Sequence, residues 1–254
     1  MSFPLRTRTR GRPGRNAGTK LVAAAPSFSN PLTGWTTDPV HGVWASDPSW
    51  SAPADGGAVS SWRNGGSVGG DLVQATGARQ PTYRASTAAF NNQPTVQGDG
   101  IDDRLVTATL ATITQPVWVV LLAQYLPTAY GTRALFDGSA ATTRIYDAGA
   151  AQHSMFGGVL LNTGVAISTS VPHLHVCQFN GATSTYQLNG SAIGSGAAGA
   201  NGITAITLLA ATGGSQAASA HIAYAAVFTT DPTGQAEWAA FKAWVTSFYG
   251  VTVA

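Results

Sequence analysis

The amino-acid sequence predicts an all-β protein, an antiparallel sandwich or jelly roll with one C-terminal helix. Short runs of β-branched and aromatic residues alternate with turn formers about every 8 to 12 residues, a spacing typical of sandwich strands. Asn-Gly pairs follow two of these runs, and this pair is the strongest short-range signal for a hairpin. Charged residues make up only 9% of the 254 residues, which argues against coiled coils and long surface helices.

The strands are expected from about residue 60 onward. The strongest prediction is a buried strand at 117–125, which is rich in Val, Leu and aromatic residues. Further strands are predicted at 134–136, at 155–161 and 164–168 as a hairpin around Asn162-Thr163, and at 173–179, 183–188, 203–210 and 221–228. Turns are expected at Asn180-Gly181 and Asn189-Gly190.

A single helix is predicted at about 232–249. Asp231 is expected to cap its first turn, and Pro232 suits the first helical position. Apolar residues then recur at spacings of three and four, on one face: Trp238, Phe241, Trp244, Val245 and Phe248. Gly250 is expected to end the helix. The apolar face should pack against the sandwich.

Basic residues are concentrated at the N-terminus. Residues 1–20 contain six of the thirteen and no acid: Arg6, Arg8, Arg10, Arg12, Arg15 and Lys20. We therefore divide the chain into a basic extended arm at 1–20 and a sandwich domain at 21–254. Like charges with Gly and Pro cannot bury apolar surface. The arm is therefore either a solvated tail or a segment that docks on an acidic partner surface.

The segment at 21–60 is expected to be irregular chain held in place by aromatic side chains. Trp35, Trp44 and Trp50 lie among turn formers such as Asp47-Pro48, and flexible linkers lack tryptophan.

Several classes of protein are excluded or disfavoured by what the sequence lacks. Cys177 is the only cysteine, which excludes an intrachain disulfide and a cysteine-based zinc site. The longest apolar run, 117–123, is far shorter than the roughly 20 residues of a membrane helix, so no membrane contact is expected. No secretory signal peptide is expected, because the apolar stretch at 21–25 stops at Pro26.

The motifs typical of hydrolases and nucleotide-binding enzymes lack their context. The pattern at 65–69 matches a nucleophile elbow, and that at 194–199 a dinucleotide loop, but an apolar helix follows neither. Glycosidases on sandwich folds use two carboxylates, one of them with a raised pKa. Glu237 is the only glutamate and falls on the predicted helix. We therefore expect the protein not to be an enzyme, and we assign no catalytic residue and no cofactor.

Two small groups are candidate metal ligands. Asp99, Asp102 and Asp103 lie within five residues and have the oxygen ligands that Ca²⁺ prefers. The alternative is a set of turn-capping aspartates whose charge Arg104 offsets. His173 and His175 share one face of a strand and are suitably spaced for a metal, but the sequence shows no third ligand. An ordinary strand is the simpler interpretation.

Several blocks, each weak by itself, occur in the order of one known family. They are 59–62, 74–83, 93–96, 98–105, 179–181, 186–190, 222–228 and 248–250. Together they resemble the concanavalin A-like, laminin-G-like jelly-roll domains of bacterial and phage proteins, over residues from about 40 to 252. The resemblance implies a two-sheet jelly roll of about a dozen strands. The closely spaced Glu/Asp motif of the family's enzymatic branches is absent here.

The resemblance also implies a function. The first expectation is a non-enzymatic structural protein of a tailed-bacteriophage virion, either a minor tail protein or a capsid decoration protein. Its arm at 1–20 would attach it to other virion proteins rather than to nucleic acid, and it would be oligomeric in the particle. The alternative is a carbohydrate-binding module that contacts host cell-surface glycans through exposed Trp and Tyr.

Overall fold

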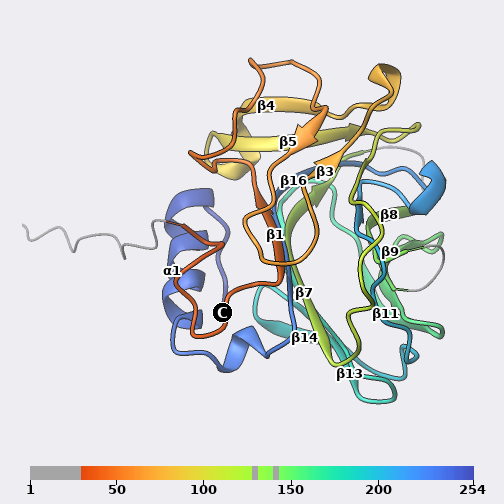
Figure 1. Cartoon of the computed structure of the whole chain (residues 1–254). Helices are drawn as coiled ribbons and strands as arrows, with labels where there is room; N and C mark the ends of the chain where they lie inside the picture. Colours follow the sequence, from red (N-terminus) through yellow and green to blue (C-terminus); the bar gives the residue numbers. More distant parts are fainter. Residues whose placement is uncertain (1–29, 128–130, 140–142) are drawn as a thin grey trace, which may run out of the picture.

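The computed structural model describes residues 30–127, 131–139 and 143–254. Two antiparallel sheets lie face to face, and the helix α1 (Trp238–Tyr249) covers the outer face of one sheet, so the described chain forms three layers (Figure 1). This arrangement confirms the predicted all-β jelly-roll sandwich with a C-terminal helix. The basic arm at 1–20 lies outside the described residues.

The first sheet has eight strands, with β7 and β16 near its centre. Its strands are β1 (His41–Trp44), β4 (Thr82–Thr87), β5 (Gln93–Asp99), β7 (Val117–Tyr125), β12 (His173–Phe179), β13 (Ser184–Leu188), β14 (Ser191–Gly196) and β16 (Ser219–Phe228). Their order is β14-β13-β12-β7-β16-β5-β4. β1 pairs with the second half of β16, where His41 lies opposite Val227, and β5 pairs with the first half.

The second sheet also has eight strands, but four of them are only two residues long. Its strands are β2 (Ser61–Trp62), β3 (Leu72–Val73), β6 (Leu105–Val106), β8 (Thr132–Asp137), β9 (Arg144–Ala148), β10 (Gln152–Phe156), β11 (Leu160–Ala166) and β15 (Thr207–Leu208). Their order is β11-β10-β9-β8-β15-β6-β3-β2. The short strands gather at one edge, where loops make up most of the surface.

Two apolar cores explain why the predicted strand at 117–125 is buried along its whole length. Alternate residues of β7, such as Val119 and Leu121, enter the core between the sheets. The residues between them, such as Val120 and Leu122, enter a second core under α1. Because both faces of the first sheet are covered, β7 reads as a continuous apolar run without the usual alternation.

The predicted helix at 232–249 is wrong in its first turns. Asp231 does cap a turn, since its Oδ1 accepts the Thr233 backbone N–H at 2.8 Å, but this turn is a short 3₁₀ helix at Pro232–Gly234. Gln235 then leaves helical geometry, because its side-chain amide pairs with the backbone N–H and C=O of Thr37. α1 begins only at Trp238.

The end of α1 and one hairpin agree with the sequence prediction. Gly250, at φ +72°, ends α1 in the left-handed region that glycine adopts without strain. Asn189 and Gly190, at φ +51° and +85°, form the predicted turn between β13 and β14.

The hairpin predicted around Asn162-Thr163 is wrong. The chain turns instead at 157–159, where Gly158 has φ +110°, and both polar residues belong to β11. The Ser154 hydroxyl donates to Asn162 Oδ1 at 2.7 Å, so this side chain pairs across the strands rather than turning the chain. The strand predicted at 203–210 is also shorter, since only Thr207–Leu208 forms a named strand there.

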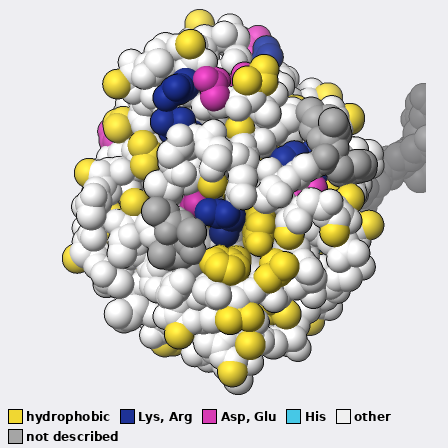
Figure 2. Space-filling view, turned by 90° about the vertical axis from the view of Figure 1, so that its right-hand side faces the viewer, with side chains coloured by type: hydrophobic (Ala, Val, Ile, Leu, Met, Phe, Trp, Pro, Cys, Tyr) yellow, Lys and Arg dark blue, Asp and Glu magenta, His cyan; other side chains and the backbone are white. Residues whose placement is uncertain are grey.

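The chain carries few charges, and two ion pairs of the second sheet are largely buried. Figure 2 shows this side of the molecule, where dark blue and magenta groups lie next to one another among mostly uncharged side chains. Arg144 Nη2 lies 2.8 Å from Asp137 Oδ2, and Arg133 Nη2 lies 3.0 Å from Asp147 Oδ2. Among the described residues, no helix is long and apolar enough to cross a membrane.

Candidate functional site

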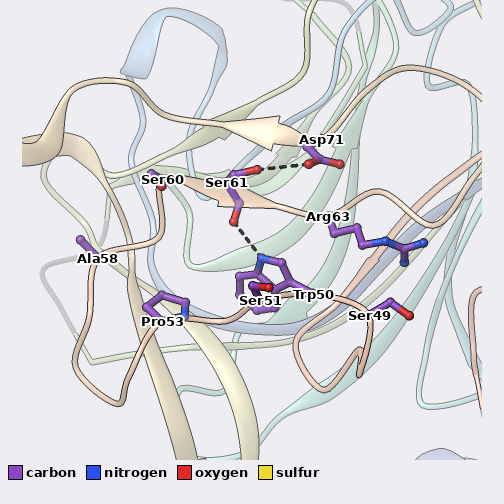
Figure 3. Close-up of a pocket in the computed structure, with 9 residues that line it drawn as sticks. All are labelled: Ser49, Trp50, Ser51, Pro53, Ala58, Ser60, Ser61, Arg63 and Asp71. Carbon is purple, nitrogen blue, oxygen red and sulfur yellow. Dashed lines mark hydrogen bonds between the residues drawn. The ribbon is translucent and has the colours of Figure 1, made fainter.

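An open pocket lies beside the two-residue strands β2 and β3 (Figure 3). It has a volume of about 390 Å³. Its lining residues come from the segment after β1 and from the chain around β2 and β3: Ser49, Trp50, Ser51, Pro53, Ala58, Ser60, Ser61, Arg63 and Asp71. The pocket therefore brings together two segments that are both irregular except at β2.

Trp50 forms the aromatic part of the lining. Its indole Nε1 donates to the backbone carbonyl of Ser61 at 2.9 Å, as the lower dashed line in Figure 3 shows. Its ring stacks on Trp62 at a centroid distance of 5.7 Å and meets the edge of Tyr83 at 5.6 Å. The ring is partly exposed, while Trp62 is fully buried. Trp50 is thus fixed from behind and accessible from the pocket.

The turn at Asp47-Pro48 explains the position of Trp50. Asp47 Oδ1 accepts the backbone N–H of Ser49 at 2.9 Å, and its carbonyl oxygen accepts that of Trp50 at 3.1 Å. Aspartate favours such turns because its short side chain bonds to the backbone two residues on. The prediction of an irregular segment at 21–60, with strands only from about residue 60, is wrong at 41–44, because these residues form β1 and pair with β16. Trp35 and Trp44 are buried, as expected of side chains that hold the segment in place.

Asp71 supplies the negative charge of the pocket. Its Oδ2 accepts the Ser61 hydroxyl at 3.3 Å, and its Oδ1 accepts the Asn64 backbone N–H at 3.0 Å. Because the residue is exposed, its carboxylate has further acceptor positions open to a ligand.

Arg63 supplies the positive charge. Its Nη1 lies 2.7 Å from Asp47 Oδ2, and this carboxylate side chain is 1% exposed while that of Arg63 is 41% exposed. A carboxylate buried beneath the guanidinium fixes the arginine, and a guanidinium has five N–H donors. The pocket thus combines an aromatic ring, a cation, an anion and serine hydroxyls, a set suited to ligands rich in hydroxyl groups.

The structure brings the three predicted aspartates together. One ligand oxygen from each of Asp99, Asp102 and Asp103 lies within 4.8 Å of the others. Asp99 Oδ1 accepts the backbone N–H groups of Ile101, Asp102 and Asp103, the shortest at 2.8 Å, so Asp99 caps a turn.

The charge of the cluster is offset by a different arginine than expected. Arg79 Nε lies 3.4 Å from Asp102 Oδ2, in the role that we expected for Arg104. Burial, and then the charge of Asp99, raises the pKa of Asp103 to about 6. Calcium binding here stays a prediction.

The other predicted binding residues lie outside the described part of the chain: Arg6, Arg8, Arg10, Arg12, Arg15 and Lys20. Their docking on a partner also stays a prediction.

Trp50 was expected from the sequence only as an aromatic anchor of the segment at 21–60, and Arg63 and Asp71 were not expected to belong to a site. Both residues flank the glycine-rich segment at 65–70, which the structure shows without helix or strand. This glycine-rich segment could have indicated the site, because a tight loop brings the polar residues at its two ends close together.

Comparison with known proteins shows the fold but no family. No family model and no curated protein matches the chain. The Trypanosoma rangeli sialidase in complex with sialic acid has a TM-score of 0.50 and 10% sequence identity, over 84% of this chain and 33% of the sialidase chain. This chain therefore spans about a third of the length of the sialidase.

Two further solved structures are similar at lower TM-scores. Domain 4 of a GH43 extracellular arabinanase from Geobacillus stearothermophilus, in complex with arabinotriose, has a TM-score of 0.44 and 11% identity, over 59% of this chain and 75% of that domain. A carbohydrate-binding module from Bacillus subtilis has a TM-score of 0.35 and 13% identity, over 58% of this chain and 89% of the module.

The comparison contradicts our expectation that the protein is not an enzyme. A glycosidase chain, the sialidase, contains a similar sandwich fold. The presence of a single glutamate does not exclude a glycosidase, because ten of the eleven acidic residues are aspartates and a glycosidase can use these as well. The expectation of a phage protein finds no match among these structures.

Proposed function

We propose that this sandwich binds carbohydrate in the pocket beside β2 and β3. The observation that carries the proposal is the partly exposed ring of Trp50, fixed between Trp62 and the Ser61 carbonyl and placed next to Arg63 and Asp71. Sugars present C–H groups on their ring faces and hydroxyl groups at their edges, so they need an aromatic surface together with polar groups. The similar sialidase was solved with sialic acid, which makes a sugar the first ligand class to test.

Each of these lining side chains has a distinct role in this proposal. The Trp50 ring provides apolar contact for sugar C–H groups. The Asp71 carboxylate accepts hydrogen bonds from hydroxyl groups, and the Arg63 guanidinium donates to hydroxyl or carboxylate oxygens. The buried Asp47 carboxylate holds Arg63 in place, so little side-chain freedom is lost when the ligand binds.

Substituting Trp50→Ala is expected to weaken binding at least about tenfold, since alanine removes the only aromatic side chain in the lining. The measurement is isothermal titration against a panel of polysaccharides and oligosaccharides. Trp238→Ala is the matched control, because Trp238 is also a partly buried tryptophan but lies on α1. Asp71→Asn, at an exposed residue, tests the same pocket without removing core contacts.

Release of reducing sugar is measured in the same samples, so that turnover is separated from binding. Failure of the wild-type protein to bind any glycan in the panel would refute the proposal. So would a Trp50→Ala variant and an Asp71→Asn variant that both bind as the wild type does.

The finer proposal is that the protein is a component of a tailed-phage virion. The feature that supports it is the excess of positive charge at 1–20, where six basic residues occur without an acid. In this proposal the arm is a tether that docks on an acidic groove of a neighbouring virion protein.

Deleting residues 2–20 is expected to leave the sandwich folded and to abolish its incorporation into particles. Thermal melting follows the fold, and quantitative mass spectrometry of purified particles follows incorporation. A truncated protein that reaches wild-type occupancy would show that the arm is only a solvated tail.

A further inference from the structure

Three imidazole rings meet between the two sheets. His173 and His175 project from β12 of the first sheet, and His153 projects from β10 of the second. The ring centroids lie 5.4 Å apart for His153 and His175, 6.0 Å for His153 and His173, and 6.3 Å for His173 and His175. The sequence predicted only that His173 and His175 share one face of their strand. The third ring comes from the opposite layer of the sandwich.

Three ring nitrogens of this cluster are buried and lack a hydrogen-bond partner. They are both nitrogens of His153 and the Nε2 of His173. His153 is only 1% exposed, so water outside the protein cannot compensate. Buried polar atoms are nearly always paired in folded proteins, and exceptions mark places where an ion, water or ligand binds.

The ring of His175 is oriented by hydrogen bonding. His175 Nδ1 lies 2.8 Å from the Tyr186 hydroxyl, which also forms a hydrogen bond with Cys177. When Tyr186 donates to the Cys177 sulfur, its oxygen accepts the Nδ1 proton of His175, and His175 Nε2 keeps a free lone pair. Burial lowers the pKa of His153 to about 4 and that of His175 well below its usual value. All three rings are therefore neutral near pH 7, the form that binds metals.

We propose that His153, His173 and His175 bind one divalent transition-metal ion of the Zn²⁺ class, which joins the two sheets. Three imidazoles around a tetrahedral Zn²⁺ place their ring centroids roughly 5 Å apart, given metal–nitrogen bonds of about 2 Å. The separations in the fold, 5.4, 6.0 and 6.3 Å, exceed this value by about 0.4 to 1.3 Å.

Binding requires the rings to turn toward one another. Within the described residues, only the three aspartates already place one ligand atom each within 4.8 Å of the others. Turning His153 breaks no hydrogen bond, because both of its nitrogens are unpartnered. His173 is partly exposed, so an ion reaches the two buried rings along its side.

Asn189 controls the protonation of His173. Its Oδ1 accepts the Leu174 backbone N–H at 2.8 Å, so its Nδ2 faces His173 Nδ1 at 3.0 Å as a donor. His173 Nδ1 must then accept, and the ring proton lies on Nε2. Coordination through Nε2 requires this proton to move to Nδ1, with loss of the Asn189 hydrogen bond. A carboxylate at position 189 would instead accept the Nδ1 proton and leave Nε2 ready for the metal.

The test uses the untagged full chain at pH 7.5. ZnCl₂ is titrated by calorimetry, and CoCl₂ is titrated by visible absorption, because tetrahedral Co²⁺ absorbs strongly. We expect one ion per chain, affinity at least about 100-fold weaker in His153→Phe, and about tenfold tighter in Asn189→Asp. His221→Asn is the matched control, since it removes a buried histidine elsewhere and should leave the affinity unchanged.

A rise in melting temperature with ZnCl₂ that His153→Phe abolishes would support the site independently of calorimetry. If His153→Phe does not fold, the Zn²⁺ affinity of Asn189→Asp relative to the wild type still tests the proposal. Wild-type protein that binds no ion at micromolar Zn²⁺ would overturn the proposal. Equal affinity of the wild type and Asn189→Asp, or of the wild type and folded His153→Phe, would also overturn it.

Discussion

Acidification from pH 7 to pH 4 is expected to lower the free energy of unfolding by about 6 kcal/mol through two buried histidines. Burial lowers the pKa of both His41 and His221 from 6.5 to about 4, although Asp71 near His41 opposes the shift. In the unfolded chain both titrate near 6.5. The unfolded state therefore binds more protons between pH 6.5 and 4, and the stability present above pH 6.5 is lost over this window at about 3 kcal/mol for each residue.

Urea unfolding at pH 7 and at pH 4 measures this loss. Asparagine does not titrate, so the double variant His41→Asn and His221→Asn should lose about 6 kcal/mol less than the wild type over the same interval. At position 221 it also keeps a polar group near the Thr95 hydroxyl, which lies 2.9 Å from the histidine Nδ1. Asp103 acts with the opposite sign, because its pKa is raised to about 6 and protonation then favours the fold. An equal loss in the double variant and the wild type would refute the prediction.

Trp244→Ala is expected to lower the free energy of unfolding by about 3–5 kcal/mol. Trp244 is 5% exposed and lies on the face of α1 that covers the first sheet. Its ring stacks on Phe248 at 5.4 Å and meets the edges of Trp44 at 5.7 Å and Tyr249 at 5.3 Å. Truncation would leave a large cavity among stiff rings that cannot close it.

Chemical denaturation followed by circular dichroism measures this effect. Ser247→Ala is the control on the same helix, because Ser247 is exposed and its loss should change stability by about 0.5 kcal/mol or less. An unchanged midpoint for Trp244→Ala would refute this prediction and make α1 a candidate interface.

Local signals in the sequence were sufficient for the long strands and several turns. The apolar run of β7 and the Asn189-Gly190 turn are fixed by residues next to one another in the chain. Strands of two residues, such as β2 and β3, show no period, so pattern analysis cannot find them. The delayed start of α1 depends on Gln235 pairing with Thr37, a contact across 198 positions.

The candidate sites were harder to predict because they depend on register between distant segments. Arg63 is an ordinary surface residue until the fold places it over the buried Asp47. His153 joins His173 and His175 only because β10 and β12 lie in facing sheets. Sequence spacing shows which residues share a strand face, but not which strand of the other layer lies opposite.

The position of β16 and α1 has a consequence for how the protein is made. β16 separates β7 from β5 at the centre of the first sheet, and Trp44 of β1 bonds to Tyr249 across 205 positions. A nascent chain therefore leaves the ribosome with the apolar outer face of β7 bare until α1 has emerged. Folds of such high contact order form in milliseconds to seconds rather than microseconds. During that interval the bare strand can pair with other chains, so yield in a cell depends on a low concentration of unfolded chains or on chaperones that shield the strand.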